Sequence, residues 1–268
     1  MNFQFDQASH SYGVPGDLRN WTSATAMVAI FHDKFDAVAM SESTSRNMRS
    51  KWFGMDPFEI RARWDAKSRQ SRDLGHWYHS KKEAEILNRG YVTFRDQRLK
   101  VYPPLIIDGK PSARPQQLEP GVYVEHMMYD EEYLVCGMED VVIVTDDFID
   151  MVDHKTSLTI DSESFKDKRM YPPLSEIRDC NFGHYTVQMN LYMYMALQHN
   201  PTKQAGNMVI NHVMFYESEG PYGERIMTLS ADGHPIVKQL KRYEIPNIQP
   251  LINRMLNTRR HQLEAFPY

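Results

Sequence analysis

The stretch EDVVIVTDDFIDMVDHKTS, residues 139–157, predicts the centre of the fold. Two apolar runs flank residues 146–147, and a two-residue connection between such runs is typical of a β-hairpin. The register that this turn imposes places Asp140 opposite Asp153, with their Cβ atoms about 5 Å apart. Lys155 points to the same face as Asp153, because side chains alternate along a strand. The sequence therefore predicts two carboxylates and a lysine at one end of an apolar row.

Two facing carboxylates repel each other unless a cation lies between them. Mg²⁺ typically binds one or two carboxylates together with waters and phosphate oxygens, and Lys155 could contact the same water or phosphate. The ordinary alternative is a solvated surface hairpin, in which acids and lysines are common. A three-residue turn would also move Asp140 away from Asp153. The hairpin by itself leaves both interpretations open.

Further β-type runs surround this hairpin. Residues 122–129, 133–144 and 148–157 are separated by turn residues and predict a meander. The proline-rich residues 92–120 favour irregular structure or short edge strands. Other strands are expected in a hairpin over 3–14 and in a run over 207–218 that pairs with 224–230.

Helices are predicted before and after the meander. Asp56, Pro57 and Glu59 form a strong helix start, and helical character continues to a C-cap at Gly90, with a break expected near residues 72–76. Further helices are expected after the N-cap candidates Thr22 and Ser23, over residues 184–200 before Pro201, and over residues 235–263.

This order of elements predicts one α/β domain over residues 1–268, with a central mixed sheet between helices. Its expected parts are a mainly helical segment over 1–90, the sheet and a helix over 91–217, and a terminal strand and helix over 218–268.

The composition is that of an ordinary globular protein, with 41% apolar and 25% charged residues and a net charge of −4. Two cysteines, Cys136 and Cys180, cannot supply a four-thiolate zinc or iron–sulfur site. Without a signal-peptide pattern or 18 consecutive apolar residues, we expect a cytoplasmic protein that does not interact with membranes. Basic residues gather over 46–51, 61–72 and 238–260, although each group also suits a solvated helix face.

Several chemistry-bearing residues lie outside the hairpin. His79 and Glu83 are four residues apart on the predicted long helix, so they share a face. Imidazole is a common metal ligand, although a lone histidine is more often structural. Glu125 lies on the strand before the hairpin. Gln188 and Tyr192 repeat at helical spacing, which is also typical of a packed helix face.

Taken in order, these motifs resemble the PD-(D/E)XK nuclease superfamily, and within it the RecB-like exonuclease branch with its phage-encoded and mitochondrial members. The matching motifs are Gly-x-x-x-His at Gly75–His79, Gly-x-x-Asp at Gly137–Asp140, Asp-x-Lys at Asp153–Lys155 and Gln-x-x-x-Tyr at Gln188–Tyr192. The resemblance covers roughly residues 5–217. Glu139 stands where many members have proline.

The resemblance implies a restriction-endonuclease-like core and one or two Mg²⁺ or Mn²⁺ ions, with no iron–sulfur cluster. Lys155 would orient the attacking water or stabilise charge on the phosphate. Gln188 and Tyr192 would hold the DNA backbone. The metal ligands that the resemblance implies are His79, Asp140, Asp153, the backbone carbonyl of His154 and, as an additional acid, Glu125.

The activity implied is a metal-dependent DNA exonuclease that acts on strand ends, with single-stranded DNA as the favoured substrate. Arg61, Lys67 and Arg72 would line a channel for the phosphate backbone, and Trp77 would stack on bases. A recombinase or a single-strand-binding protein is a potential partner. The alternatives are a structure-specific or double-strand-end nuclease of the same superfamily, and a nuclease-like DNA-binding protein without catalysis.

Overall fold

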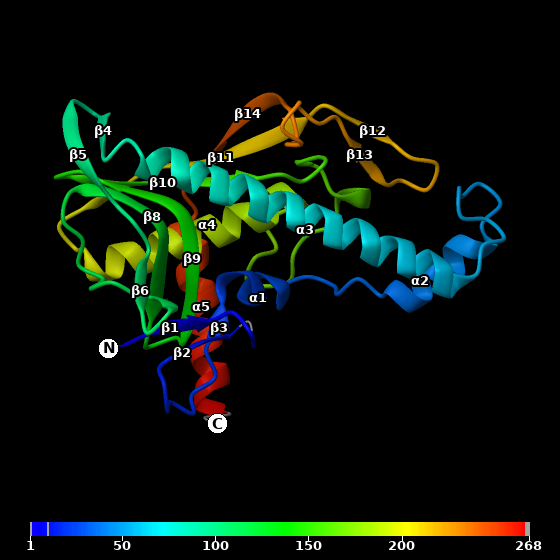
Figure 1. Ribbon diagram of the computed structural model, residues 1–268. Coiled ribbons are helices and arrows are strands. Elements are labelled where there is room, and N and C mark those ends of the chain that lie inside the picture. Colours follow the sequence, from blue (N-terminus) through cyan, green and yellow to red (C-terminus); the bar gives the residue numbers. More distant parts are fainter. Residues whose placement is uncertain (1, 10, 266–268) are drawn as a thin grey trace.

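The computed structural model describes residues 2–9 and 11–265. The chain has an α/β fold in which helices flank a large, curled, mixed β-sheet (Figure 1). Helix α3 (Pro57–Leu87) runs across one side of this sheet, and α4 (Asn181–His199) and α5 (Gln249–Ala265) lie behind it (Figure 1).

The large sheet has eight strands, including β3 (Thr22–Ser23), which pairs beside one of the central strands. Three of its strand pairs, β10–β11, β5–β8 and β3–β9, are parallel, and the others are antiparallel. The order along the main path is β14 (Val237–Ile245), β11 (Gln204–Phe215), β10 (Phe148–Lys155), β9 (Val135–Val144), β8 (Gly121–Asp130), β5 (Gln97–Tyr102) and β4 (Tyr91–Phe94).

The remaining strands form two small sheets. The predicted N-terminal hairpin is confirmed, and it joins two short strands from the proline-rich region in the order β2 (Ser11–Gly13), β1 (Gln4–Asp6), β7 (Lys110–Ser112), β6 (Leu105–Ile107). The second small sheet is a hairpin of β12 (Glu217–Glu219) and β13 (Arg225–Met227).

The predicted register of the central hairpin is confirmed. Val144 pairs with Ile149, and the same pairing continues to Val141 with Val152. At the turn, Thr145 N donates to the carbonyl oxygen of Phe148 over 2.9 Å, which leaves two residues in the connection. The apolar alternation and the short turn agree on one register, because a slip by one residue would expose the buried row.

Helix α3 begins as the sequence predicts, with the Asp56 carboxylate accepting a 2.7 Å hydrogen bond from Phe58 N. Ser23 caps α1 (Ala24–Ala29) in the same way, by accepting from Ala26 N over 3.2 Å. The remaining helical elements are α2 (Ala37–Arg46), which the sequence patterns do not announce, and the short 3₁₀ helix η1 (Phe165–Asp167).

The break expected near residues 72–76 is wrong, because α3 runs without interruption through Gly75. Leu74 and Tyr78 are buried on either side of this glycine and pack in one cluster with Val213 and Phe215 of β11. These contacts hold both halves of the helix on one axis. Tertiary packing thus outweighs the weak helix propensity of glycine.

Replacement of Gly75 by alanine is expected to stabilise the fold by about 0.5–1 kcal/mol, because alanine loses less backbone entropy in a helix. An added Cβ would lie 3.5 Å from Thr156 Oγ1, which is an ordinary contact. Urea unfolding of both proteins measures the difference. Gly90→Ala is the matched control, since Gly90 has a φ of +67° and the substitution there is expected to destabilise.

The C-terminal expectations need two corrections. Residues 237–245 form a strand rather than part of a helix, and the helix begins only at Gln249. Residues 224–230 were expected to pair with the strand over 207–218. Strand β11 instead pairs with β14, and β13 pairs with β12. Pairing with β14 satisfies the backbone groups along one edge of β11. The sequence of residues 237–245 does not reveal this long-range pairing.

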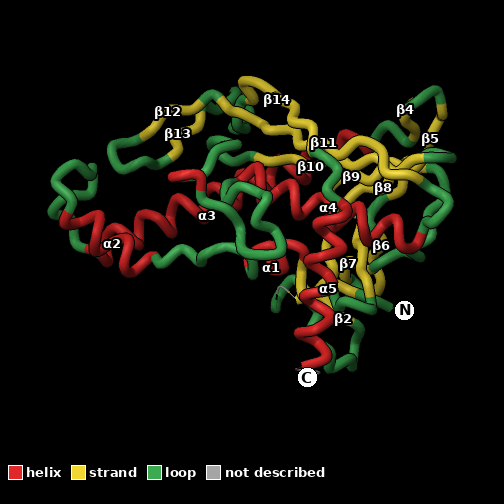
Figure 2. The backbone as a smooth tube through the Cα atoms, turned by 180° about the vertical axis from the view of Figure 1, so that it is seen from behind, coloured by secondary structure: helices red, strands yellow, loops and turns green. Residues whose placement is uncertain are grey.

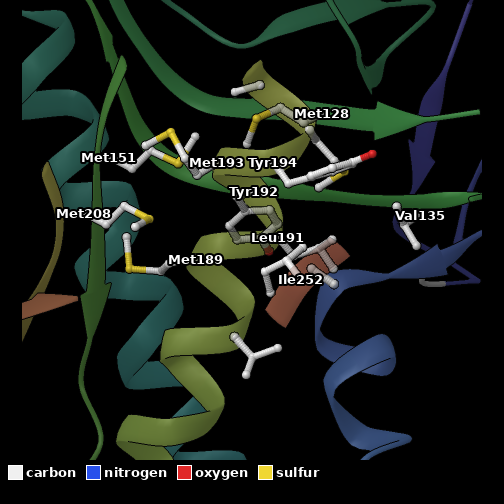
Figure 3. Packing of buried hydrophobic residues seen from close by; sticks show 14 of the residues in the cluster. Met128, Val135, Met151, Met189, Leu191, Tyr192, Met193, Tyr194, Met208 and Ile252 are labelled. Carbon is white, nitrogen blue, oxygen red and sulfur yellow. The ribbon is translucent and has the colours of Figure 1, made fainter. Parts of the chain in front are cut away.

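The main core lies between the sheet and α4. Side chains from both strands and helices interdigitate there, including Met151, Met189, Leu191 and Met193, all nearly inaccessible to solvent (Figure 3). Ile252 of α5 packs against the far side of α4 (Figure 3). On the opposite face of the sheet, the end of α3 covers a second apolar cluster.

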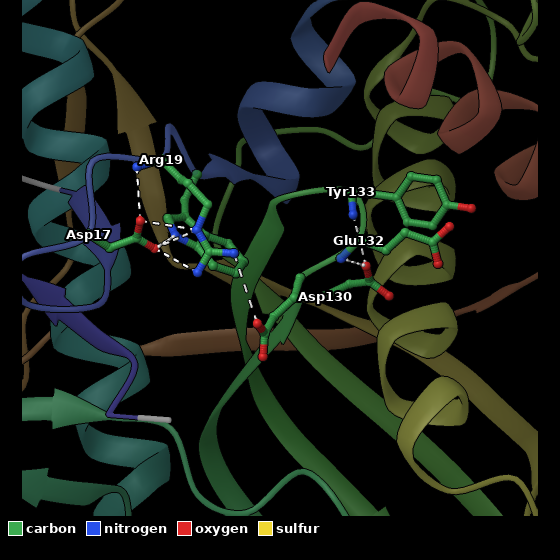
Figure 4. Close-up of polar contacts among 7 residues, drawn as sticks. Asp17, Arg19, Asp130, Glu132 and Tyr133 are labelled. Carbon is green, nitrogen blue, oxygen red and sulfur yellow. Dashed lines mark hydrogen bonds and ion pairs between the residues drawn. The ribbon is translucent and has the colours of Figure 1, made fainter. Parts of the chain in front are cut away.

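The N-terminal loop and the β8–β9 turn are fixed by local polar contacts. The Asp17 carboxylate accepts from the Arg19 side chain at 2.9 Å, and Asp130 Oδ1 accepts from the backbone of Glu132 and Tyr133 at 2.9 and 3.0 Å (Figure 4). These carboxylates satisfy backbone and guanidinium donors within the two loops.

Helix α2, the first half of α3 and the β12–β13 hairpin extend beyond the sheet on one side (Figures 1 and 2). The hairpin contacts the α2–α3 segment through an ion pair of 2.8 Å between Lys51 Nζ and Glu219. The rings of Trp52 and Tyr222 also stack, with centroids 6.0 Å apart. No helix in the described part of the chain is both long and apolar enough to cross a membrane.

Candidate metal and nucleic-acid site

His79, Glu125 and Asp140 converge from three different elements. His79 comes from α3, Glu125 from β8 and Asp140 from β9. His79 Nδ1 lies 3.1 Å from Asp140 Oδ1 and 3.9 Å from Glu125 Oε1. One ligand atom from each of the three lies within 4.8 Å of the others, which is a spacing that suits a shared metal ion. The structure thus brings three of the predicted ligands close to one another.

The charges in this cluster are mutually dependent. Burial disfavours the imidazolium form, but the neighbouring Asp140 and Glu125 carboxylates outweigh it and raise the pKa of His79 to about 10. Burial opposes the charge on Asp140 too, yet the bond from His79 and the His154 N–H hold the pKa of this carboxyl below its usual range. The two carboxylates therefore favour positive charge at His79, and a metal ion bound by this imidazole would displace its proton.

Asp153 and Lys155 form the neighbouring part of the site. Lys155 Nζ donates to Asp153 Oδ1 over 2.9 Å, and Asp153 is buried. Burial opposes the charge on Lys155, but the Asp153 and Asp140 carboxylates raise the pKa of Lys155 above its usual range. Beside them, His154 N donates to Asp140 Oδ2 over 2.6 Å, immediately beyond the last ladder pair of the hairpin. The lysine thus remains an ammonium next to the carboxylate cluster.

The imidazole of His154 packs edge-on against Tyr78, with ring centroids 5.6 Å apart. The main chain of His154 contacts Asp140 directly, through the 2.6 Å bond from its N–H.

Glu139 is a buried acid that the motifs do not single out. Its side chain is inaccessible to solvent, and neither carboxyl oxygen has a hydrogen-bond partner among the residues that the structure describes. Burial, together with the charges of Asp153 and Asp140, raises the pKa of Glu139 well above its ordinary value. A buried, unpartnered carboxyl is costly, and this one lies beside the acids of the site. Its position before Asp140 in the sequence was the available signal.

Glu125 has a strained backbone, with a φ of +47° inside strand β8. Such left-handed residues other than glycine cost of order 1–3 kcal/mol and gather at functional sites. Burial raises the pKa of Glu125, so both its conformation and its environment are unfavourable for a purely structural residue. Glu83 lies beside it, and burial and the Glu125 charge raise its pKa as well.

Gln188 and Tyr192 lie on α4, which brings them to the other side of the same strands. Gln188 Nε2 donates to Tyr192 Oη over 3.1 Å and contacts Thr25 Oγ1 over 3.3 Å. Tyr192 is buried, and a Cβ atom added at Gly137 would lie only 2.4 Å from its ring. The glycine three residues before Asp140 therefore provides space for this tyrosine.

Replacement of Gly137 by alanine is expected to destabilise the protein by about 1–3 kcal/mol, since the new methyl group must displace the buried Tyr192 ring. Thermal or urea unfolding measures the loss. Gly13→Ala is the matched control, because a Cβ there would meet Trp21 at an ordinary 3.8 Å. Equal stability of the two variants would contradict this role of Gly137.

Two cavities meet at His79. One has a volume of about 670 Å³ and is lined by residues of α3, including Arg72, Gly75 and Glu83, and by Glu125. Its opposite wall comes from the N-terminal and proline-rich strands, namely Phe5, Gln7, Pro104, Ile106 and Pro111. The second has a volume of about 290 Å³ and is lined by Ser68, Ser71, Arg72, His79, His154, Lys155, Thr156 and Ser157. No sequence pattern marks the strand wall, because it comes from residues distant along the chain.

Among the predicted DNA contacts, Arg72 is exposed and lines both cavities. Trp77 instead packs against Phe215 and His234, with ring centroids 6.3 and 5.8 Å apart. Arg61 and Lys67 precede His79 by 18 and 12 residues, about 27 and 18 Å of helix rise. Arg61 Nη1 donates to Ser41 Oγ of α2 over 2.7 Å, and Lys67 Nζ lies near Gly223 in the turn of the β12–β13 hairpin. The structure thus brings Arg72 to the site and leaves the other three away from it.

Comparison with models of known protein families, with curated proteins and with solved structures gives no match for this chain. The assignment of a function therefore rests on the chemistry of the site.

Proposed function

We propose that this chain is a metal-dependent DNA exonuclease with a restriction-endonuclease-like core, a member of the PD-(D/E)XK superfamily that acts on single-stranded ends. The observation that carries the proposal is the convergence of His79, Glu125 and Asp140 beside the Asp153–Lys155 pair. Two carboxylates around an imidazole suit Mg²⁺ or Mn²⁺.

His79, Glu125 and Asp140 would hold the metal, with Asp153 and the His154 carbonyl as the further candidates. A bound Mg²⁺ or Mn²⁺ ion supplies Lewis acidity toward the phosphate and lowers the pKa of a coordinated water. Asp140 is held in place by the His154 N–H, so its orientation does not depend on the substrate. Lys155 is positioned by Asp153 and carries a full charge, so it can donate hydrogen bonds to a phosphate oxygen as negative charge develops there.

Arg72 and the two cavities support nucleic acid as the substrate. A guanidinium binds phosphate through two parallel hydrogen bonds, and Arg72 is exposed at the junction of both cavities. An extended chain that followed the cavities would pass His79 and Lys155 in succession.

The test is incubation of the purified chain with end-labelled linear single strands, linear duplexes and circular single strands, with Mg²⁺, Mn²⁺ or EDTA. We expect metal-dependent release of short products from linear single strands and intact circles. Asp140→Asn, purified identically, controls for contaminating nucleases. Cleavage of circles would replace the exonuclease with an endonuclease, and no cleavage of any of these DNAs would contradict the nuclease proposal itself.

A further inference from the structure

A second group of metal-ligating side chains lies outside the nuclease site. His32 follows α1, Asp179 precedes α4, and His184 lies in the first turn of α4. One ligand atom from each of the three lies within 4.8 Å of the others. The two imidazole rings are nearly parallel, with centroids 4.2 Å apart, and His184 Nε2 lies 2.8 Å from Asp179 Oδ1.

We propose that His32, Asp179 and His184 bind a divalent transition-metal ion, with Zn²⁺ as the best match, and that this ion ties the segment after α1 to the start of α4. Two imidazoles and one carboxylate are a ligand set that zinc uses in proteins, whereas Mg²⁺ prefers oxygen ligands. The chemistry therefore differs from that of the acid-rich nuclease site. This inference does not depend on the proposed nuclease function.

The hydrogen bonds of the two histidines indicate which ring nitrogens would bind the ion. His32 Nδ1 contacts the carbonyl oxygen of Asp33 at 3.0 Å, and a carbonyl can only accept, so the lone pair of a neutral His32 is on Nε2. His184 shares its Nε2 proton with Asp179, and a metal ion would displace this proton.

The distance between His184 and Asp179 is close to that required. Two ligands about 2.0–2.1 Å from a zinc ion and at the tetrahedral angle lie about 3.3 Å apart. The observed separation of 2.8 Å would therefore need to widen by about half an ångström. Lys168 bonds to Asp179 through the other carboxylate oxygen, Oδ2, at 2.9 Å, and so leaves Oδ1 facing His184.

Backbone hydrogen bonds hold the three ligands in register. Asp179 N donates to the carbonyl of Lys168, and Tyr171 N donates to the carbonyl of Phe31, the residue before His32, at 2.9 and 2.7 Å. The loop between η1 and α4 is thereby bonded to the residue before His32 and to Asp179. Ligands that are preorganised in this way lose little conformational entropy when an ion binds.

The placement suggests what the ion would do. Gln188 follows His184 by one helical turn on α4 and contacts Thr25 of α1. An ion between His32 and His184 would join α4 to the segment that follows α1. It would therefore fix the position of the helix that carries Gln188 and Tyr192.

The experiment is zinc titration of the full chain by calorimetry, with the midpoint of thermal unfolding as the second readout. We expect one zinc ion to bind to the parent and also to His79→Ala, with a rise in the melting temperature. His32→Gln and His184→Gln are expected to weaken this binding by about 100-fold, since each removes a direct ligand. His234→Gln, at an exposed histidine outside the cluster, is the matched control.

His32 is half-buried and lies outside the helices, so its glutamine variant should fold even if the His184 variant does not. Binding by His32→Gln with the affinity of the parent would overturn the proposal. So would the loss of all zinc binding in His79→Ala, because the ion would then belong to the nuclease site. A DNA-cleavage assay is not needed for either conclusion.

Discussion

Lys155→Ala is expected to slow metal-dependent cleavage of single-stranded DNA by about 10²–10³-fold, the usual effect of removing one group that stabilises developing charge. The Lys155 ammonium lies 2.9 Å from Asp153, and the carboxylates of Asp153 and Asp140 keep it charged. No other group in the hairpin places a full positive charge there. The loss should appear mainly in kcat, since the lysine acts on charge that grows during the reaction.

The measurement is single-turnover cleavage of an end-labelled strand with Mn²⁺ at saturating enzyme. Lys238→Ala is the matched control, because Lys238 is an exposed lysine on β14. It should retain the rate of the parent. Lys155→Arg keeps a positive charge but not the geometry, so it should recover only part of the loss. A rate for Lys155→Ala within threefold of the parent would remove this lysine from the proposed mechanism.

Arg225→Ala is expected to destabilise the fold by about 3–5 kcal/mol, because it leaves a largely buried carboxylate without its partner. Arg225 is 4% exposed, and its guanidinium donates to both oxygens of Glu217 at 2.6 and 2.9 Å. Its third contact is a 2.9 Å bond to the carbonyl oxygen of Thr156, the residue after Lys155. This arginine therefore connects the β12–β13 hairpin to the end of the strand that carries the site.

Urea unfolding of the single and double variants separates the causes. Arg225→Met with Glu217→Leu removes both charges and should recover most of the stability, as replacement of buried ion pairs by apolar side chains often does. If the double variant is as unstable as Arg225→Ala, the bond to Thr156 is the main contribution instead. A single variant with unchanged stability would contradict both explanations.

The central hairpin could be predicted because local and long-range signals agree there. The turn at residues 146–147 and the alternation of Val142, Val144, Ile149 and Met151 each specify the same register, and all four side chains are fully buried. A strand with one strongly apolar face has little freedom to slip. The helix start at Asp56 could also be predicted, because an N-cap is a local interaction between residues close in sequence.

The positions of other elements depend on contacts that sequence patterns do not contain. Strand β14 is exposed at most positions, so its sequence lacks the alternation that predicts strands, and its pairing with β11 decides its conformation. The continuity of α3 across Gly75 depends on packing against β11. The parallel pairing of β5 with β8 joins segments without a local turn signal.

The candidate site also has some features that the sequence predicts and others that depend on long-range contacts. The residue types of His79, Asp140, Asp153 and Lys155 were available from their motifs, and the structure brings them together. The isolation of the Glu139 carboxyl was not predictable, because burial of an acid depends on the surrounding elements. The cluster of His32, Asp179 and His184 joins residues more than 140 positions apart, so no local motif can predict it.

The uninterrupted course of α3 limits how this chain can change in length. One residue inserted between Gln70, which bonds to the backbone of Arg225, and His79 would turn the histidine by about 100° around the helix axis. It would also shift the histidine by about 1.5 Å along the axis. His79 would then face away from Asp140 while the outer half of α3 kept its contacts. Insertions or deletions in this segment should therefore be far less acceptable than substitutions, even at its exposed positions.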